Sequence, residues 1–325
     1  MKTLHHLRNR LMLPGLILAL TATACSELLP TPDVSGEDCN NVCTAYTMVI
    51  GCDNRAEKPE SVDAATTEPW SFTGQFYKKS PEGNPVPHCT GVLIADRYIL
   101  TAAHCLYNQG NNQLGFALAQ EYESLRPYGT HGVRRVFVPK KFKISDSESF
   151  RAYDYGIAEL WEPIQGATPA HWGYVDWDIL KFKFASTAGY PGTIPGGGKN
   201  LLNTPWITNG DYYNQQPFGL IDNNQAGLLY TDLDGSGGQS GSAVYSFLFP
   251  AEHSGNGVIR KVTGILIGSP VSACENDQNW VSRLTPETVE RIENAMTYGT
   301  GPIDLSWEVI DIPFSPTSGP GKAWP

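Results

Sequence analysis

The chain has 325 residues, 41% of them hydrophobic and 17% charged, which is enough for one large globular domain or two small ones. Its formal net charge of −10 at pH 7 gives it no electrostatic reason to bind nucleic acid or an anionic membrane surface. Helical periodicity is scarce, whereas short runs of Val, Ile, Leu, Tyr and Phe recur between Gly, Pro and Asn. These features predict an all-β fold.

Residues 1–24 have the pattern of an export signal. The first ten residues carry three basic residues and no acidic residue. They precede the apolar run "LMLPGLILAL", which is too short to span a bilayer, and small residues follow this run before Cys25. Removal of the segment takes the formal net charge from −10 to −13, because three positive charges leave with it. We therefore expect an exported protein.

Two interpretations of the cleavage before Cys25 stay open. Ala22 and Ala24 satisfy the small-x-small rule of an ordinary signal peptidase, which predicts a secreted protein. The stretch also resembles a bacterial lipobox, although Ala22 stands where Leu is usual. A lipid on Cys25 would make the protein a cell-envelope lipoprotein, at the outer membrane or the cell surface. It would also leave six of the seven cysteines, an even number that suits disulfide pairing.

Residues 25–69 read as a polar, Pro-containing tether in which Cys39, Cys43 and Cys52 lie close together in sequence. Three cysteines can bind zinc, but the segment has no His and an oxidising compartment favours disulfides. We therefore expect a small cross-linked knot and no metal. The pairing of these cysteines and of Cys274 stays open.

The stretch "CTGVLIADRYILTAAHC", residues 89–105, predicts a β-hairpin around "ADR". Cys89 and Cys105 bracket the hairpin, a placement that suits a disulfide. His104 stands at its far end. A histidine beside an apolar run is usually packed in a core, and a catalytic base is the other interpretation.

Asp154 precedes the strand-like run "YGIAEL". An aspartate at the entrance to a strand is usually a turn residue. A role in catalysis therefore depends on which other groups accompany it.

The stretch "DGSGGQSGS", residues 234–242, has the composition of a flexible linker. It is flanked by "GLLYTDL" and "AVYSFLF", however, which are apolar and rich in strand-forming residues. This setting predicts a tight loop between buried strands, built around the single hydroxyl of Ser240.

Ser240, His104 and Asp154 together supply the groups that an activated serine needs. A serine hydroxyl is a weak nucleophile at neutral pH, so an imidazole must take its proton and a buried carboxylate must orient that imidazole. Gly238 has no Cβ, which lets the backbone turn so that the Gly238 and Ser240 N–H groups face one oxyanion. The three motifs together therefore favour catalysis over the structural interpretations of each.

In the order His, Asp, Ser, the motifs "TAAHC", "DYGIAEL" and "GGQSGSAV" resemble those of trypsin/chymotrypsin-like serine proteases. "GQSGS" and "AGYPG" (188–192) are similar to the bacterial glutamyl-endopeptidase-like branch. The resemblance covers about residues 70–298. It implies two antiparallel Greek-key β-barrels, with the first ending near residue 165 and the site in the cleft between them, and the triad roles are implied with it.

Beyond the second predicted barrel, "TPETVERIENAM" (285–296) predicts a helix with a Thr cap and Pro286 at its first position, similar to the C-terminal helix of the family. Residues 299–325 are expected to form a Pro/Gly-rich tail. The predicted organisation is therefore a signal (1–24), a tether (25–69), a protease domain (70–298) and this tail.

Two departures from the family pattern concern activation and specificity. Trypsin-like zymogens pair a new N-terminal amine with an Asp just before the nucleophile, and that position here is Gln239. A chain starting anywhere from about residue 53 to 66 is therefore expected to be active without further cleavage. Leu266 stands where glutamyl endopeptidases have a pocket His, which argues against a glutamate pocket.

The remaining specificity residues are taken from the same resemblance. Asp234 has the offset of trypsin's pocket-floor Asp, but it also reads as a turn residue in "DLDG". With Leu266, the next residues Ile267 and Gly268 are expected on the pocket wall. An apolar or small substrate side chain is the favoured preference.

We therefore expect an exported serine endopeptidase that cleaves protein or peptide substrates through an acyl-enzyme intermediate, as a monomer without a cofactor. The alternative is a catalytically inactive trypsin-like binding module on the cell surface. A structural lipoprotein with incidental motifs is a further alternative. Labelling by a fluorophosphonate probe distinguishes an enzyme from both.

Overall fold

The computed structural model describes residues 47–49, 53–107, 113–122, 124–142, 151–201, 203–213, 227–269, 279–298 and 306–312. The chain divides into residues 1–37 and residues 38–325, and every described residue belongs to the second unit. The predicted signal and five cysteines (Cys25, Cys39, Cys43, Cys52 and Cys274) lie outside the described residues. Within these ranges, no helix has the length and apolar character needed to cross a membrane.

The first barrel is a closed antiparallel sheet in the order β7-β6-β3-β4-β5-β8, closed by pairing of β7 with β8. Its order β6-β3-β4-β5 is a Greek key. The strands are β3 (Thr73–Lys79), β4 (Pro85–Ala95), β5 (Tyr98–Thr101), β6 (Leu114–Leu118), β7 (His131–Pro139) and β8 (Gly156–Leu160). The predicted hairpin is confirmed, since β4 pairs with β5 at Leu93 and Ile99.

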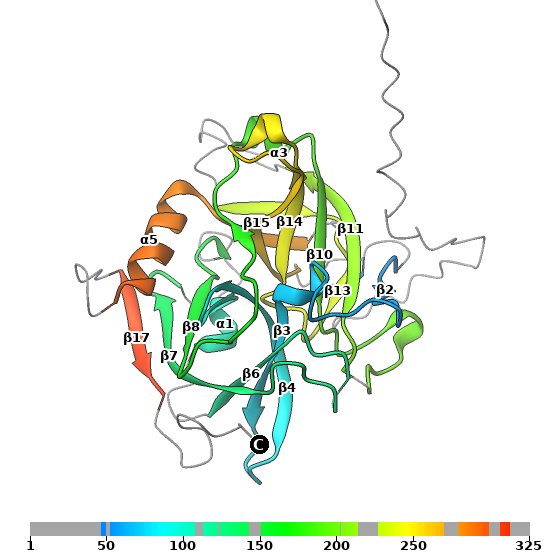
Figure 1. Cartoon of the computed structure of the whole chain (residues 1–325), viewed down its shortest axis with the longest axis vertical. Helices are drawn as coiled ribbons and strands as arrows, with labels where there is room; N and C mark the ends of the chain where they lie inside the picture. The colour runs from blue at the N-terminus through cyan, green and yellow to red at the C-terminus, as the bar shows by residue number, and fades with distance from the viewer. Residues whose placement is uncertain are drawn as a thin grey trace, which may run out of the picture. The chain divides into compact units, whose positions relative to one another are not determined.

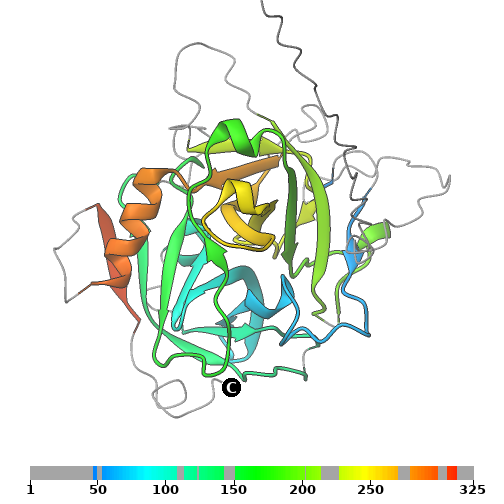
Figure 2. The same ribbon diagram turned by 45° about the horizontal axis from the view of Figure 1, so that its top comes forward.

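The second barrel closes in the same way, in the order β10-β14-β15-β16-β12-β11 with β11 paired back to β10. Its order β14-β10-β11-β12 is again a Greek key. The strands are β10 (Phe184–Gly189), β11 (Trp206–Tyr213), β12 (Leu228–Thr231), β14 (Ala243–Leu248), β15 (Ile259–Gly268) and β16 (Asn279–Arg283). The prediction of an all-β fold with two barrels is confirmed, and Figure 2 shows both, the first in cyan to green and the second in green to orange.

Apolar side chains from every strand fill the barrels, as the short apolar runs of the sequence predict. In the first barrel, the buried rings of Phe76 and Phe116 pack 4.9 Å apart between their centroids. In the second, Leu229, Val244 and Val281 belong to one buried cluster. The two cores fix the ends of the strands from which the loops of the site arise.

Short strands from outside the predicted protease domain pair with strands inside it: β2 and β17 join the barrel sheets, and β1 forms a separate two-stranded sheet. Strand β1 (Thr47–Met48) pairs with β13 (Gly235–Ser236), and β2 (Ala56–Glu57) pairs with β11. Strand β17 (Trp307–Asp311) pairs with β7 (Figure 1). Parts of the predicted tether and tail are therefore packed on the barrels, because their backbones complete sheet edges that the sequence pattern does not reveal.

Helix α5 (Pro286–Met296) confirms the predicted C-terminal helix and its cap, since the Thr288 N–H donates to the Thr285 side chain. The helix follows the second barrel but contacts the first, where the Tyr98 hydroxyl donates to the Met296 carbonyl at 2.9 Å. The other helices are short: α1 (Ala103–Leu106), α3 (Trp177–Leu180) and the 3-10 turns η1 (Trp70–Phe72), η2 (Pro195–Gly197) and η3 (Pro250–Glu252).

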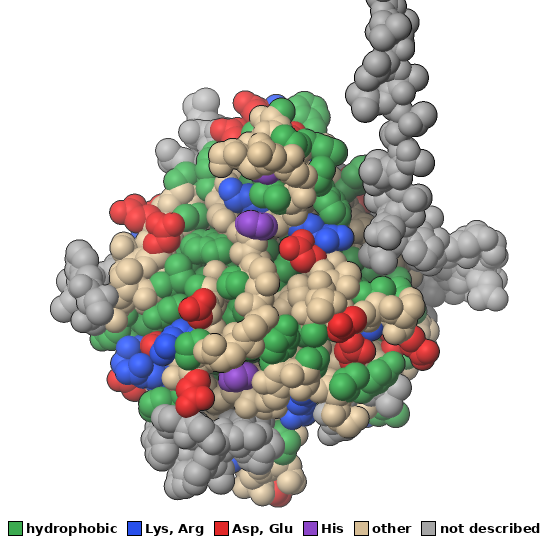
Figure 3. Space-filling model, viewed as in Figure 1, with side chains coloured by type: hydrophobic (Ala, Val, Ile, Leu, Met, Phe, Trp, Pro, Cys, Tyr) green, Lys and Arg blue, Asp and Glu red, His purple; other side chains and the backbone are tan. Residues whose placement is uncertain are grey.

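Acidic and basic side chains are interspersed on the face shown in Figure 3. Arg135, for example, pairs with Asp311 at 2.6 Å and with Glu159 at 3.4 Å. The Asp311 side chain is 73% exposed, so solvent screens its pair and the pair contributes little to stability, whereas Glu159 is buried beneath Arg135.

Candidate active site

His104 and Asp154 meet at the edge of the first barrel. His104 lies in α1, directly after β5, and Asp154 lies just before β8, which pairs with β5. The His104 Nδ1–H donates to Asp154 Oδ2 at 2.8 Å, and the His104 backbone N–H donates to Oδ1 at 2.9 Å. The carboxylate thus holds both the ring and its backbone, and Nε2 of the neutral ring is left to accept a proton.

Burial divides the roles of these two side chains. The Asp154 side chain is 1% exposed, whereas that of His104 is 30% exposed. A buried carboxylate in a fixed pair orients the ring, and the exposed edge of the ring can reach a reacting group.

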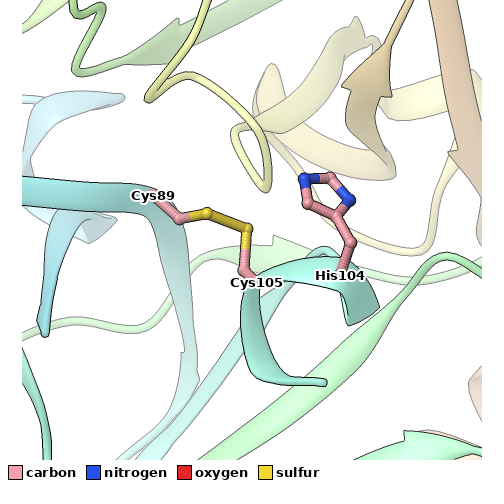
Figure 4. Close-up of side chains that lie close together, drawn as sticks. All are labelled: Cys89, His104 and Cys105. Carbon is pink, nitrogen blue, oxygen red and sulfur yellow. A yellow bond between two sulfur atoms is a disulfide. The ribbon is translucent and has the colours of Figure 1, made fainter. Parts of the chain in front are cut away.

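A disulfide anchors the helix that carries His104. Cys89 in β4 is bonded to Cys105 in α1, with their Cα atoms 6.2 Å apart, which confirms the predicted pair. Figure 4 shows His104 beside this disulfide. These three residues are the one group of mutually close potential metal ligands in the described ranges. The two cysteine sulfurs are bonded to each other in the disulfide. A metal ion binds cysteine as a thiolate, so this group does not have the chemistry of a metal site.

Ser240 comes from the second barrel, in the loop between β13 and β14, and this loop docks on the first barrel. The Thr90 N–H donates to the Ser240 carbonyl at 2.9 Å, and the Cys105 sulfur lies 3.8 Å from the same oxygen. Gly241 has a φ of +86°, and a Cβ at this position would overlap Thr101 Oγ1 and the Thr90 carbonyl oxygen. The closeness of these backbones brings Ser240 to the segment that carries His104.

No hydrogen bond of the Ser240 hydroxyl itself is found among the described residues. Hydrogen bonds in catalytic sites are often long before a substrate binds. The role of Ser240 as nucleophile therefore stays a prediction that rests on its placement.

The predicted oxyanion site uses the backbone N–H groups of Gly238 and Ser240. Neither the Gly238 N–H nor the Ser240 N–H donates to another group in the described part of the chain, whereas the Gln239 N–H between them turns away and donates to Ser236 O at 3.0 Å. Gly238 has a φ of +96°, and a Cβ there would lie 2.6 Å from Tyr190 O. Only glycine fits this backbone, which leaves two amides available for one anion.

His88 contacts the same helix from β4. Its Nε2–H donates to the Cys105 carbonyl at 3.0 Å. Burial, followed by the positive charge of Lys78, lowers the pKa of His88 to about 4 in spite of this hydrogen bond. The ring is therefore neutral at physiological pH beside the backbone that positions His104.

The predicted pocket-floor residue, Asp234, is completely buried, and its Oδ2 accepts a hydrogen bond from the Asn54 N–H at 2.7 Å. Asn54 belongs to the segment that the sequence assigns to the tether, and Thr208 donates to its side chain. Because the Asp234 carboxylate has no exposed surface, a substrate cation would have to displace buried groups to reach it.

The other predicted pocket residues lie on β15. Leu266 belongs to the core cluster of the second barrel, and its Cδ2 faces Gly235, the residue after Asp234. Ile267 is 2% exposed, and Gly268 ends the strand with a φ of +146°. Met48 from β1 packs on Gly235 as well, a contribution that the sequence pattern does not suggest.

The sequence patterns also do not single out Arg55, which is buried and contacts the residue before Ser240. Arg55 Nη1 donates to Gln239 Oε1 at 3.3 Å. Gln239 is the one feature of the sequence that could have indicated such a contact, because a polar side chain in a buried loop requires a hydrogen-bond partner.

Comparisons with known proteins agree with this fold. The family described as "Trypsin-like peptidase domain" matches residues 89–247, which include His104, Asp154 and Ser240. A glutamyl endopeptidase of Bacillus licheniformis is 29% identical over 201 residues, covering 61% of this chain and 54% of its own. Serine protease 23 of Bos taurus is 26% identical over 227 residues, with the same coverage of 61% and 54%.

A solved structure of a Glu endopeptidase in complex with MPD covers 76% of this chain and 98% of its own, with a TM-score of 0.54 and 19% identity. This likeness shows the two-barrel fold. The chain spans about half the length of the curated relatives it matches.

Residues 89–247 match the trypsin-like peptidase domain, and the two closed barrels that contain them have the fold of such proteases, in agreement with the resemblance seen in the sequence. Both a glutamyl endopeptidase sequence and a Glu endopeptidase structure are among the proteins similar to this chain, which supports the predicted resemblance to the glutamyl-endopeptidase-like branch.

Proposed function

We propose that the protein is an exported serine endopeptidase that hydrolyses peptide bonds through an acyl-enzyme on Ser240. The observation that carries the proposal is the pairing of His104 with buried Asp154 beside the docked Ser240 loop. The family and the relatives support a proteolytic function.

In the proposed mechanism, His104 Nε2 takes the Ser240 hydroxyl proton as Oγ bonds to the substrate carbonyl carbon. The carbonyl oxygen becomes an oxyanion, which the Gly238 and Ser240 N–H groups bind, each such donor contributing about 3 kcal/mol. The protonated His104 then gives its proton to the leaving amine as the C–N bond breaks. Water, deprotonated by His104, hydrolyses the acyl-enzyme and restores Ser240.

Export is supported by the Cys89–Cys105 disulfide, because such bonds persist in oxidising compartments and are rare in the cytosol. The sequence of residues 1–24 points the same way. Lipidation of Cys25 stays a prediction, tested by whether Cys25→Ser releases the protein from membranes.

The substrate preference follows from Asp234 and Leu266. The Asp234 carboxylate has no exposed surface, which argues against selection of Arg or Lys. The Bacillus licheniformis relative is named for cleavage at glutamyl bonds, but Leu266 offers no polar group to a buried carboxylate. We therefore propose a preference for apolar or small side chains.

The test of the proposed function is labelling and turnover in the Ser240→Ala variant. Removing the nucleophile removes the covalent route with little loss of packing, so peptidase and esterase activity should disappear while the unfolding temperature stays unchanged. His104→Ala should cost a similar factor, because triad members act as a unit. Fluorophosphonate labelling of Ser240→Ala, or its turnover at the wild-type rate, would contradict the assignment.

A further inference from the structure

A buried arginine from the N-terminal segment contacts the loop that precedes the nucleophile. Arg55 lies just before β2 and is 4% exposed, and its guanidinium donates in three directions. Nε and Nη2 donate to the two carboxylate oxygens of Asp53 at 2.8 and 2.6 Å. Nη1 donates to Thr193 O at 2.8 Å and to Gln239 Oε1 at 3.3 Å. We call these four residues, Asp53, Arg55, Thr193 and Gln239, the Arg55 clamp.

The positive charge of Arg55 is neutralised by the carboxylate of Asp53, which also belongs to the clamp. A guanidinium is too costly to bury alone, and the planar carboxylate of Asp53 meets its fork with two parallel hydrogen bonds. Asp53 therefore neutralises Arg55 and fixes its orientation. Nη1 is then directed at the two loops of the second barrel.

The Gln239 side chain links Arg55 to the turn that precedes Ser240. Its Oε1 accepts the Ser236 N–H at 3.0 Å as well as Arg55 Nη1, and its own N–H donates to Ser236 O at 3.0 Å. These bonds close a tight turn over 236–239. Gly238, with its φ of +96°, lies in this turn, and neither its N–H nor that of Ser240 donates to another group in the described residues.

The clamp also joins this turn to the loop after β10. Gly192 N–H donates to Gly237 O at 2.6 Å, and Ser236 Oγ donates to Thr193 O at 3.2 Å. Arg55 binds Thr193 O and Gln239 together, so the two loops are held at a common point. Loss of Arg55 would remove one of two donors from each of these oxygens, because Ser236 supplies the other to both Thr193 O and Gln239 Oε1.

We propose that Arg55 is a positioning residue that holds the oxyanion amides in their active orientation through Gln239. The inference rests on the proposed peptidase function. Arg55 would supply, from within the chain, the cation that trypsin-like zymogens obtain from a new N-terminus. The guanidinium of Arg55 is present without any cleavage. The sequence predicted activity for a chain that starts anywhere between residues 53 and 66. With this role for Arg55, only a chain that still contains Arg55 should be fully active, because a chain that begins after it lacks the cation.

The test compares full-length Arg55→Met, Gln239→Met and the double variant. Each preparation is titrated with a fluorophosphonate, and kcat and KM are measured on a peptide substrate per titrated site. Arg55→Met should lower kcat on the order of 100-fold, the effect of losing an oxyanion donor, with KM changed less than about threefold. The double variant should be no slower than the slower single variant, since both changes break one unit.

A second measurement reads the loop without activity. Hydrogen exchange of the backbone amides of residues 235–242, followed by mass spectrometry, should become faster in Arg55→Met and in Gln239→Met. Arg283→Met is the matched control: Arg283 is 1% exposed and donates to Val175 O in the second barrel. It should lower the unfolding temperature while leaving kcat and the exchange of 235–242 within about twofold of wild type.

Three results would overturn the proposal: kcat of Arg55→Met within about threefold of wild type, losses that multiply in the double variant, or unchanged exchange of 235–242. A wild-type protein that a fluorophosphonate does not label at Ser240 would instead count against the proposed function. The exchange experiment still tests the clamp in that case.

Discussion

Gly241→Ala tests how closely the Ser240 loop must approach the first barrel. The added Cβ would overlap Thr101 Oγ1 and the Thr90 carbonyl oxygen and would lie 3.0 Å from Ala102 N. Two of these three atoms are backbone atoms of the first barrel, which cannot move aside as a flexible side chain can. The loop must therefore shift away from the barrel that carries His104.

The magnitude has two unfavourable parts and one favourable part. The φ of +86° costs a residue with a Cβ about 1–2 kcal/mol, and the overlap costs a further ~1–3 kcal/mol. The smaller conformational freedom of the unfolded alanine chain returns about 0.4–1 kcal/mol. We expect Gly241→Ala to lower the free energy of unfolding by about 1–5 kcal/mol and, because the loop carries Ser240, to reduce kcat at least ~10-fold.

Two glycines separate these parts in urea denaturation. Gly83 has a φ of +88° with no atom within 4 Å of an added Cβ, so Gly83→Ala measures the backbone strain alone. Gly237 lies in the same loop as Ser240 and has neither strain nor a close atom, so Gly237→Ala should change stability by less than about 0.5 kcal/mol. The reasoning fails if Gly241→Ala matches Gly237→Ala in both stability and kcat.

Two further predictions concern His88 and Asp234. Burial and Lys78 hold the pKa of folded His88 near about 4, against 6.5 for an unperturbed histidine, so the unfolded chain binds the proton first as the pH falls. Stability should therefore drop by up to about 3 kcal/mol between pH 6.5 and pH 4, and His88→Gln should remove this part of the pH dependence in urea titrations, whereas an identical slope in the variant would refute it. Asp234→Ser should leave the preference in a peptide-library profile nearly unchanged, because the carboxylate has no exposed surface that a substrate could contact. A collapse of cleavage after Arg or Lys by orders of magnitude would show the opposite.

The sequence by itself determined the features that depend on neighbouring residues. The hairpin of β4 and β5 follows from two apolar runs around a turn, and helix α5 follows from the Thr285 cap and Pro286. The disulfide joins cysteines 16 residues apart at the base of that hairpin. The ordered motifs selected His104 and Asp154, which the structure pairs, and the two barrels were implied by the family that these motifs resemble.

Only the tertiary structure decided the contacts between distant segments. The contact of Arg55 with Gln239 spans 184 positions, that of Asn54 with Asp234 spans 180, and β17 pairs with β7 from the far end of the chain. A two-residue strand is too short to show a periodic pattern in the sequence. A charged pair such as Asp53 and Arg55 is typical of an exposed surface in the sequence, and only the tertiary structure shows that Arg55 is buried. The second barrel brings the ends of its strands together in space, and the hydrogen bonds that buried polar groups require then determine which distant residues meet around Ser240.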